Sequence, residues 1–303
     1  MYPKKILNLS EQIQSYVDAG MEISSHQEAE EALTSIGYYR LKGYCSHKYN
    51  KKTKTYHKGT TFADILALYH FDTELSHLLF RMTSSIKVAL RVRLSEALLK
   101  YNDALILYDP SIFKDKGHYW GNMGKVSSEI ARSKDNFIKH NYNNYHGAIP
   151  MWAAVEVMSF GTLSKVITNL KPGKDGVYPE LAKYYRHTTV NGKEVLPGAD
   201  MLNSWIQTVV VIRNMCAHNG RVYNRKMKVT PQILNIDKII PVPRFSGLYQ
   251  AILAMKYLRP NDKIWSIFVV DFKNLLTKYE SVVELNKMNF PEDWEQHLSV
   301  SEE

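Results

Sequence analysis

One long stretch, FADILALYHFDTELSHLLFRMTSSIKVALRVRLSEALLKY, constrains the fold of this chain more than any other segment. It begins at Phe62 and ends at Tyr101, and its apolar residues recur with the spacing of a helix along its whole length. One i, i+3, i+4 stripe runs through its middle and is formed by Leu75, Leu78, Leu79, Met82 and Ile86. We therefore expect one long helix, or two abutting helices, with this stripe in the core.

Helical patterns also dominate the rest of the chain. Ser25 stands three residues before Glu28, the spacing of a capping box. Further helices are expected in Met151–Leu170, in PGADMLNSWIQTVVVIRNMCAH and in two C-terminal stretches, while HTTVNGKEV carries the Asn-Gly signal of a short hairpin. The predicted fold class is all-α, a helical bundle with a possible short β-hairpin. We expect a helical and basic N-terminal segment, 1–60, packed on a main all-α domain, 61–303, as one structural unit.

The charge balance favours a polyanionic partner. The chain has 39 Lys and Arg against 30 Asp and Glu, a net charge of +9, which suits RNA, DNA or an anionic membrane surface. No apolar run approaches the roughly 18 to 20 residues of a membrane-spanning helix, and the N-terminus lacks the apolar core of a signal peptide. Cys45 and Cys216 look like ordinary reduced thiols. The prediction is a cytoplasmic protein that does not associate with a membrane.

The segment VVVIRNMCAHNGRVYNR places cationic and hydrogen-bonding groups directly after an apolar helical run. If the helix continues, one stripe with spacing i, i+4, i+7, i+11 contains Asn214, His218, Arg221 and Arg225, and the adjacent stripe contains Arg213 and Asn224. Arg213 and His218 are then about 140° apart around the helix. A groove against a second surface could still bring both to one ligand.

These groups can act on RNA without a metal. A neutral His takes the proton from a 2′-hydroxyl or gives one to a leaving 5′-oxygen, Arg binds phosphate in bidentate fashion, and Asn orients the imidazole or a phosphate oxygen. The same residue types at a helix end also serve simply to cap carbonyls and to contact solvent.

The residues RNMCAH, Arg213–His218, resemble the R-x4–6-H motif of HEPN-domain ribonucleases. IGYYRLKGY, FDTELSHLLFRMTSSIKVALRVRL and PMWAAVEVMSFGTLSKVITNL resemble, in the same order, segments of the AbiD/AbiF-like abortive-infection proteins, as do NRKMKVTP and MNFPEDW. The resemblance covers nearly the whole chain. Lys87 departs from it, because an acidic residue is expected at that position.

The resemblance implies a HEPN-like all-α fold and a metal-independent endoribonuclease of phage defence that leaves a 2′,3′-cyclic phosphate. It makes Arg213, Asn214 and His218 the catalytic set, and it implies a homodimer that pairs two motifs. A structured small non-coding RNA, or an acidic protein antitoxin, would hold such an enzyme inactive. Two rival interpretations remain: a non-catalytic RNA-binding module and a toxin controlled by a partner.

Several residues outside the motif are also candidate RNA contacts. Arg221, Asn224 and Arg225 are candidates by position alone, and an aromatic and basic cluster is a further candidate for stacking bases and holding phosphates: Tyr38, Tyr39, Arg40, Lys42 and Tyr44. The alternative is that some of these rings pack in the core. NKKTKTYHK is a basic loop or strand pair, and Arg81, Arg91 and Arg93 add positive charge to the long helix.

Metal and cofactor sites are not expected. No H-E-x-x-H, C-x-x-C or i, i+4 His pair occurs, and KPGKDG lacks the spacing of a nucleotide-binding loop. Trp152, Trp205 and Trp265 are predicted to be core residues.

Overall fold

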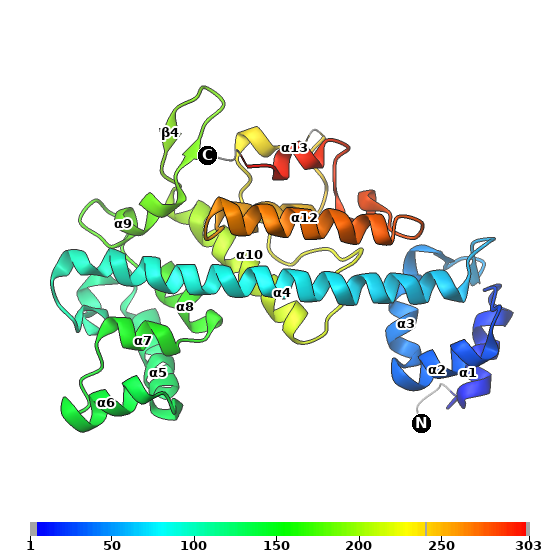
Figure 1. The fold of residues 1–303 in the computed structure, drawn as a ribbon, viewed down its shortest axis with the longest axis horizontal. Coiled ribbons are helices and arrows are strands. Elements are labelled where there is room, and N and C mark those ends of the chain that lie inside the picture. Colours follow the sequence, from blue (N-terminus) through cyan, green and yellow to red (C-terminus); the bar gives the residue numbers. More distant parts are fainter. Residues whose placement is uncertain (1–4, 240, 301–303) are drawn as a thin grey trace.

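The computed structural model describes residues 5–239 and 241–300, which fold into helices joined by loops (Figure 1). The α-helices in this part of the chain are α1 Leu9–Asp18, α2 His26–Ser35, α3 Tyr38–Tyr44, α4 Phe62–Leu98, α5 Lys116–Arg132, α6 Asn136–Asn144, α7 Met151–Val157, α8 Phe160–Thr168, α9 Tyr178–Ala182, α10 Ala199–Ala217, α11 Leu248–Tyr257, α12 Asp262–Lys278 and α13 Trp294–Leu298. The all-α prediction is therefore confirmed.

Two short antiparallel hairpins and several short 3-10 turns lie between these helices. β1, Tyr49–Asn50, pairs with β2, Thr55–Tyr56, and β3, His187–Thr188, pairs with β4, Glu194–Val195. The second hairpin is the one that the Asn-Gly signal predicts. The first lies in the basic stretch for which a loop and a strand pair were both open.

Helix α4 is continuous over 37 residues, which makes it about 55 Å long at 1.5 Å per residue. It begins where the Thr61 side chain accepts a hydrogen bond from the Asp64 amide at 3.0 Å. All five residues of the predicted stripe are buried, so the long helix and its core face are both confirmed. Ser25 likewise caps α2, because its hydroxyl accepts from the Glu28 amide at 3.2 Å.

The other helices pack around α4. Helix α10 lies against α4, α8 and α11, and α12 also packs on α4. The N-terminal helices α1 to α3 gather near the beginning of α4, and α5 to α8 gather near its opposite end (Figure 1). Helix α3 contacts α4 directly, so the N-terminal segment rests on the same central helix as the rest of the bundle. Residues 1–4 and 301–303, at the ends of the two predicted domains, lie outside the described residues.

The single helix predicted over Met151–Leu170 is wrong, because the chain breaks between α7 and α8. Ser159 begins α8 as its N-cap, with a hydroxyl that accepts from the Thr162 amide at 3.2 Å. The buried carboxylate of Glu129 accepts from the Ser159 amide and from the Thr162 hydroxyl, both at 3.0 Å. A carboxylate from α5 therefore accepts hydrogen bonds from the polar groups at the break. Apolar periodicity does not reveal such a contact.

The tryptophans divide between core and surface. Trp205 and Trp265 are fully buried, as predicted, and their indole N–H groups donate to the carbonyls of Gln232 and Leu298. Trp152 is 52% exposed, so its assignment to the core is wrong.

Candidate active site at the end of helix α10

Helix α10 ends within the motif. Its last residue is Ala217, His218 is the C-cap, and Asn219 takes the left-handed conformation with φ 50°. The Gly220 amide donates to the Met215 carbonyl at 2.8 Å and the Asn219 amide donates to the Cys216 carbonyl at 3.1 Å. This is the Schellman pattern, formed with Asn in the left-handed position where Gly is more common.

The predicted stripe across 214–225 is therefore wrong beyond His218. The chain leaves the helix at Asn219, so Arg221, Asn224 and Arg225 are placed by a loop rather than by helical spacing. Asn224 has a second left-handed conformation with φ 50° and is half-buried. Arg225 is exposed, and its guanidinium approaches the Arg221 carbonyl at 3.4 Å.

The three motif side chains lie at the surface. Asn214 and His218 are exposed and Arg213 is half-buried. The Arg213 guanidinium donates to the Asn214 side-chain oxygen at 3.1 Å and lies over the ring of Phe80, 5.5 Å from its centroid. In the described part of the chain, neither Arg213 nor His218 forms an ion pair with a carboxylate. Both groups are thus left available to an anion from solvent.

Lys87 adds positive charge beside this end of α10. It is half-buried on α4, and its pKa is lowered first by burial and then by the nearby guanidiniums of Arg91 and Arg213. The acidic residue that the resemblance leads one to expect at this position would have offered Arg213 a counter-charge. With lysine there, Arg213 gains a neighbouring cation instead, although the carboxylates of Glu156 and Glu129 also act on the Lys87 pKa and raise it.

Asp72 holds the loop that follows the motif, residues 219–225 (the motif loop). This buried carboxylate on α4 accepts from the amides of Val222 and Tyr223, at 3.0 and 2.6 Å, and from the hydroxyl of Tyr44 at 2.6 Å. Burial raises the pKa of Asp72, and these hydrogen bonds oppose that rise. Sequence reasoning missed Asp72, although a signal was present: it stands at i, i+3, i+7 with Leu75 and Leu79, on the buried stripe itself.

Helix α3 contacts the same loop. The Arg40 guanidinium donates to the Asn219 carbonyl and the Arg221 guanidinium donates to the Gly43 carbonyl, both at 2.8 Å. Arg221 also lies over the ring of Tyr44 at 5.9 Å. The structure thus brings the aromatic and basic cluster of α3 next to the residues that follow the motif. Arg40 and Arg221 link α3 to the motif loop.

The aromatic cluster of α3 divides between core and surface. Tyr44 is 2% exposed, so its prediction as an RNA contact is wrong, because the packed core already covers its ring. Tyr39 is 76% exposed. Tyr38 is half-buried against Tyr16, and the exposed Lys42 donates to its hydroxyl at 3.1 Å. Tyr39, Arg40 and Lys42 are accordingly the exposed members of this cluster.

A polar cleft of about 200 Å³ lies beside the motif loop. Residues of α3, α4 and the loop line it: Arg40, Tyr44, Tyr69, Asp72, Thr73, Ser76, His77, Asn219 and Gly220. His77 of α4, which the sequence analysis did not single out, is exposed at this cleft.

The extra arginines of α4 have structural partners. Arg91 pairs with Glu156 at 2.9 Å and donates to the Met158 carbonyl at 2.6 Å. Arg93 donates to the carbonyls of Arg259 and Pro260, and Arg81 pairs with Asp271. Arg91 and Arg93 are held by part-buried contacts within the fold, and Arg81 is paired at the surface. The interpretation of these three as an RNA-binding surface is therefore not supported.

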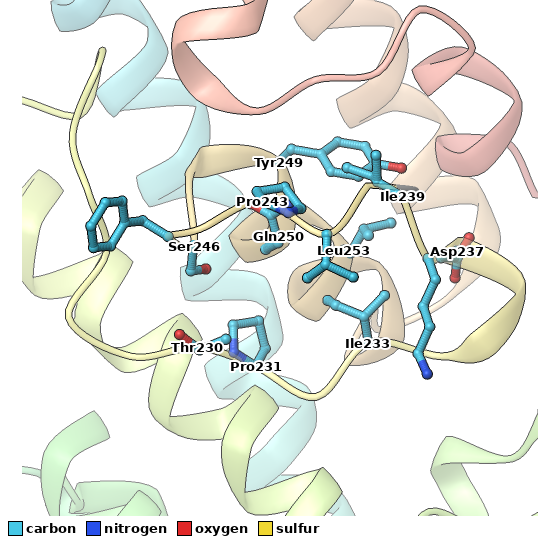
Figure 2. Close-up of a pocket in the computed structure, with 13 residues that line it drawn as sticks. Thr230, Pro231, Ile233, Asp237, Ile239, Pro243, Ser246, Tyr249, Gln250 and Leu253 are labelled. Carbon is cyan, nitrogen blue, oxygen red and sulfur yellow. The ribbon is translucent and has the colours of Figure 1, made fainter.

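A second cavity, of about 220 Å³, lies between the loop at 230–246 and helix α11 (Figure 2). Apolar residues such as Ile233, Pro243 and Leu253 make up much of its wall, and Asp237 and Tyr249 lie at its edge (Figure 2). None of the predicted site residues lines it. It is an apolar cavity separate from the motif.

The described residues offer neither a metal cluster nor a membrane span. Residues 5–239 and 241–300 contain no group of three or more His, Cys, Asp or Glu side chains arranged to hold a metal ion. No helix in that same part of the chain has both the length and the apolarity to cross a bilayer.

Comparison with known proteins gives one family. Residues 31–224 match the family described as Abi-like protein, a range that runs from α2 through α4 to the motif loop and its left-handed Asn224. The match covers more than half of the 303 residues, and the chain therefore belongs to the Abi-like protein family. This membership associates it with abortive infection, a defence against phage. Neither the curated proteins nor the solved structures contain a significant match.

Proposed function

We propose that this protein is a metal-independent endoribonuclease of the HEPN type, acting in abortive infection, with Arg213, Asn214 and His218 as its catalytic residues. The observation that carries the proposal is the unpaired state of Arg213 and His218 at the exposed end of α10, within the described residues. The arginines of α4, by contrast, are bound to carboxylates or carbonyls. A free guanidinium and a free imidazole at one helix end suit a phosphodiester.

The chemistry follows from these groups. The neutral imidazole of His218 takes the proton from the ribose 2′-hydroxyl, and the resulting oxygen attacks the adjacent phosphorus. The bond to the 5′-oxygen breaks, that oxygen takes a proton from the imidazolium just formed or from water, and the products are a 2′,3′-cyclic phosphate and a 5′-hydroxyl. Arg213 stabilises the charge that grows on the phosphate oxygens. Asn214 and the ring of Phe80 hold its guanidinium in place.

We further propose that two copies of the chain form the working site. His218 stands five positions after Arg213, which places the two about 140° apart around the axis of α10. In a two-fold dimer the same patch meets itself, so Arg213 of one copy can lie opposite His218 of the other. The RNA substrate, and the cytoplasm as its location, belong to the same proposal. A regulatory small RNA is expected to purify with the protein as a discrete, near-stoichiometric species, whereas an acidic protein partner is the competing result.

The test is cleavage of labelled RNA by purified protein in EDTA. His218→Ala is expected to lower the rate by roughly 10²–10⁴-fold with an unchanged melting temperature, because the side chain is exposed. His140→Ala, an exposed histidine on α6, is the matched control and should cleave at the normal rate.

Three results would reject the proposal. Cleavage by His218→Ala within a few-fold of the unmodified chain would remove His218 as catalyst. Loss of cleavage in EDTA would require a metal. RNA binding without any cleavage would favour the non-catalytic module. Light scattering at the assay concentration tests the dimer, which an active monomer would exclude.

A further inference from the structure

A groove between α5 and α8, with a volume of about 640 Å³, lies on a part of the protein that the proposed chemistry does not use. Its lining includes Lys114, His118, Lys125 and Lys165, together with Gln207 from α10. No Asp or Glu is among the residues that line it. A concave surface of this size with several cations and no acidic residue is suited to an anionic ligand.

Two of these lysines face each other. Lys125 and Lys165 both line the groove, and the positive charge of the neighbouring Lys125 lowers the pKa of Lys165. Neither lysine forms an ion pair in the part of the chain that the structure describes, whereas Lys183 pairs with Glu180. Two neighbouring ammonium groups without a counter-charge repel each other, and an anion placed between them would relieve that repulsion.

The groove is held rigidly by hydrogen bonds between its walls. The Asn169 side chain donates to the Asp115 carbonyl at 2.8 Å and accepts from the Asp115 amide at 3.1 Å. The Asn122 side chain on α5 donates to the carbonyl of Lys165 on α8 at 3.1 Å. These bonds fix the start of α5 against α8, so the backbone positions that carry the lysines are set before any ligand arrives.

The groove and the motif share a face of α10. Gln207 and Asn214 are seven residues apart, which places them within about 20° of the same direction and about 10 Å apart along the helix axis. A chain of phosphates that lies along this face can therefore reach the groove and the motif together.

We propose that the α5–α8 groove binds a backbone phosphate of an RNA strand, bridged by Lys125 and Lys165, while the same strand meets the motif at the end of α10. The assignment of RNA as the ligand rests on the proposed function. A free nucleotide carries the same phosphate chemistry, and the experiment separates the two sources.

The experiment measures binding in the His218→Ala protein, so that cleavage does not interfere. The double variant Lys125→Gln/Lys165→Gln is compared with Lys134→Gln/Lys139→Gln, which removes the same two charges at exposed positions outside the groove. Affinity for a labelled single-stranded RNA is followed by anisotropy over a range of salt. We expect the groove variant to bind at least 10-fold more weakly, and its salt slope to fall by about 0.7 for each phosphate that the protein no longer neutralises. The control variant should stay within a few-fold.

Equal affinity and equal salt slope in the two double variants would overturn the proposal that the groove binds RNA. A second arm maps lysine acetylation by mass spectrometry with RNA or with AMP present: protection of Lys125 and Lys165 by RNA supports the proposal, and protection by AMP alone overturns the RNA assignment.

The two proposals fail separately. If the unmodified protein never cleaves RNA but the groove variant still loses RNA binding, the proposed catalytic function is rejected and the proposed groove site is supported. If cleavage occurs and the groove variant binds RNA as the control does, the groove site is rejected and the catalytic function is supported.

Discussion

Removal of the Asp72 carboxylate is expected to release the motif loop. In Asp72→Ala the amides of Val222 and Tyr223 and the hydroxyl of Tyr44 lose their acceptor. Each buried amide left without a partner costs about 1–3 kcal/mol, or about 2–6 kcal/mol for the two. The variant also avoids the desolvation of a buried carboxylate, which raises the pKa of Asp72 and offsets part of this cost. We therefore expect a net loss of about 2–4 kcal/mol in the free energy of unfolding.

Calorimetry can measure this loss. For 303 residues, the entropy of unfolding is about 0.6 kcal/mol/K, so the melting temperature should fall by roughly 3–6 °C. RNA cleavage should fall as well, because His218 is the residue just before the loop that Asp72 holds. Glu96→Ala, which removes an exposed carboxylate from the same helix, is the control and should change stability by less than about 0.5 kcal/mol.

The pH dependence has a definite sign. The pKa of Asp72 is raised in the folded protein above its ordinary value of 3.8, so the folded state binds more protons between that value and the raised pKa. The contribution of Asp72 to stability is therefore fully present below 3.8 and decreases as the pH rises through the folded pKa. The destabilisation of Asp72→Ala, measured by urea unfolding, should be larger at low pH than at neutral pH. A melting temperature within about 1 °C of the unmodified chain, or the opposite pH trend, would refute this reasoning.

Three further predictions concern residues near the site and in the core. Gly220→Ala places a Cβ at 3.0 Å from the Met215 Cγ and 3.1 Å from its carbonyl oxygen, so thermal unfolding should show a loss of about 1–3 kcal/mol. Arg93→Ala removes the donor to two carbonyls and should cost about 1–3 kcal/mol with unchanged RNA affinity; a weakened affinity would restore Arg93 as an RNA contact. Burial raises the pKa of Cys45 to about 11 and of Cys216 to about 12, so mass spectrometry should find neither thiol alkylated by iodoacetamide at about pH 8 until the protein is unfolded.

Periodicity predicted the elements whose cause is local. The apolar spacing over Phe62–Tyr101 indicated one long helix or two abutting helices, and the stripe from Leu75 to Ile86 gave the buried face of α4. The Asn-Gly pair likewise predicted the β3–β4 hairpin, because the turn type depends on residues next to each other in the chain. The residues at 213–218 were singled out because they resemble the HEPN motif, and their catalytic role stays a prediction.

The rest depends on contacts between distant residues. The break at Ser159 depends on Glu129 of another helix, and the exposure of Trp152 depends on which face of α7 meets the core. The end of α10 was predicted within one residue, but the stripe beyond His218 fails because Asn219 takes the left-handed position and the helix does not continue. Tyr44 was left open between an RNA contact and a core ring because its partner Asp72 had not been recognised. Local patterns carry no information about such pairs.

The hydrogen bonds from the motif loop to Asp72 also affect the order in which the chain folds during its synthesis. Its partners Val222 and Tyr223 follow it by 150 and 151 residues, and Arg40 meets Asn219 across 179 residues. Closing separations of this size is entropically costly and slow compared with forming a helix. A growing chain on the ribosome can therefore complete α4 long before the motif loop acquires its anchor. A chain that terminates early, before residue 222, lacks both backbone donors to Asp72, so a truncated product cannot assemble the proposed catalytic end of α10.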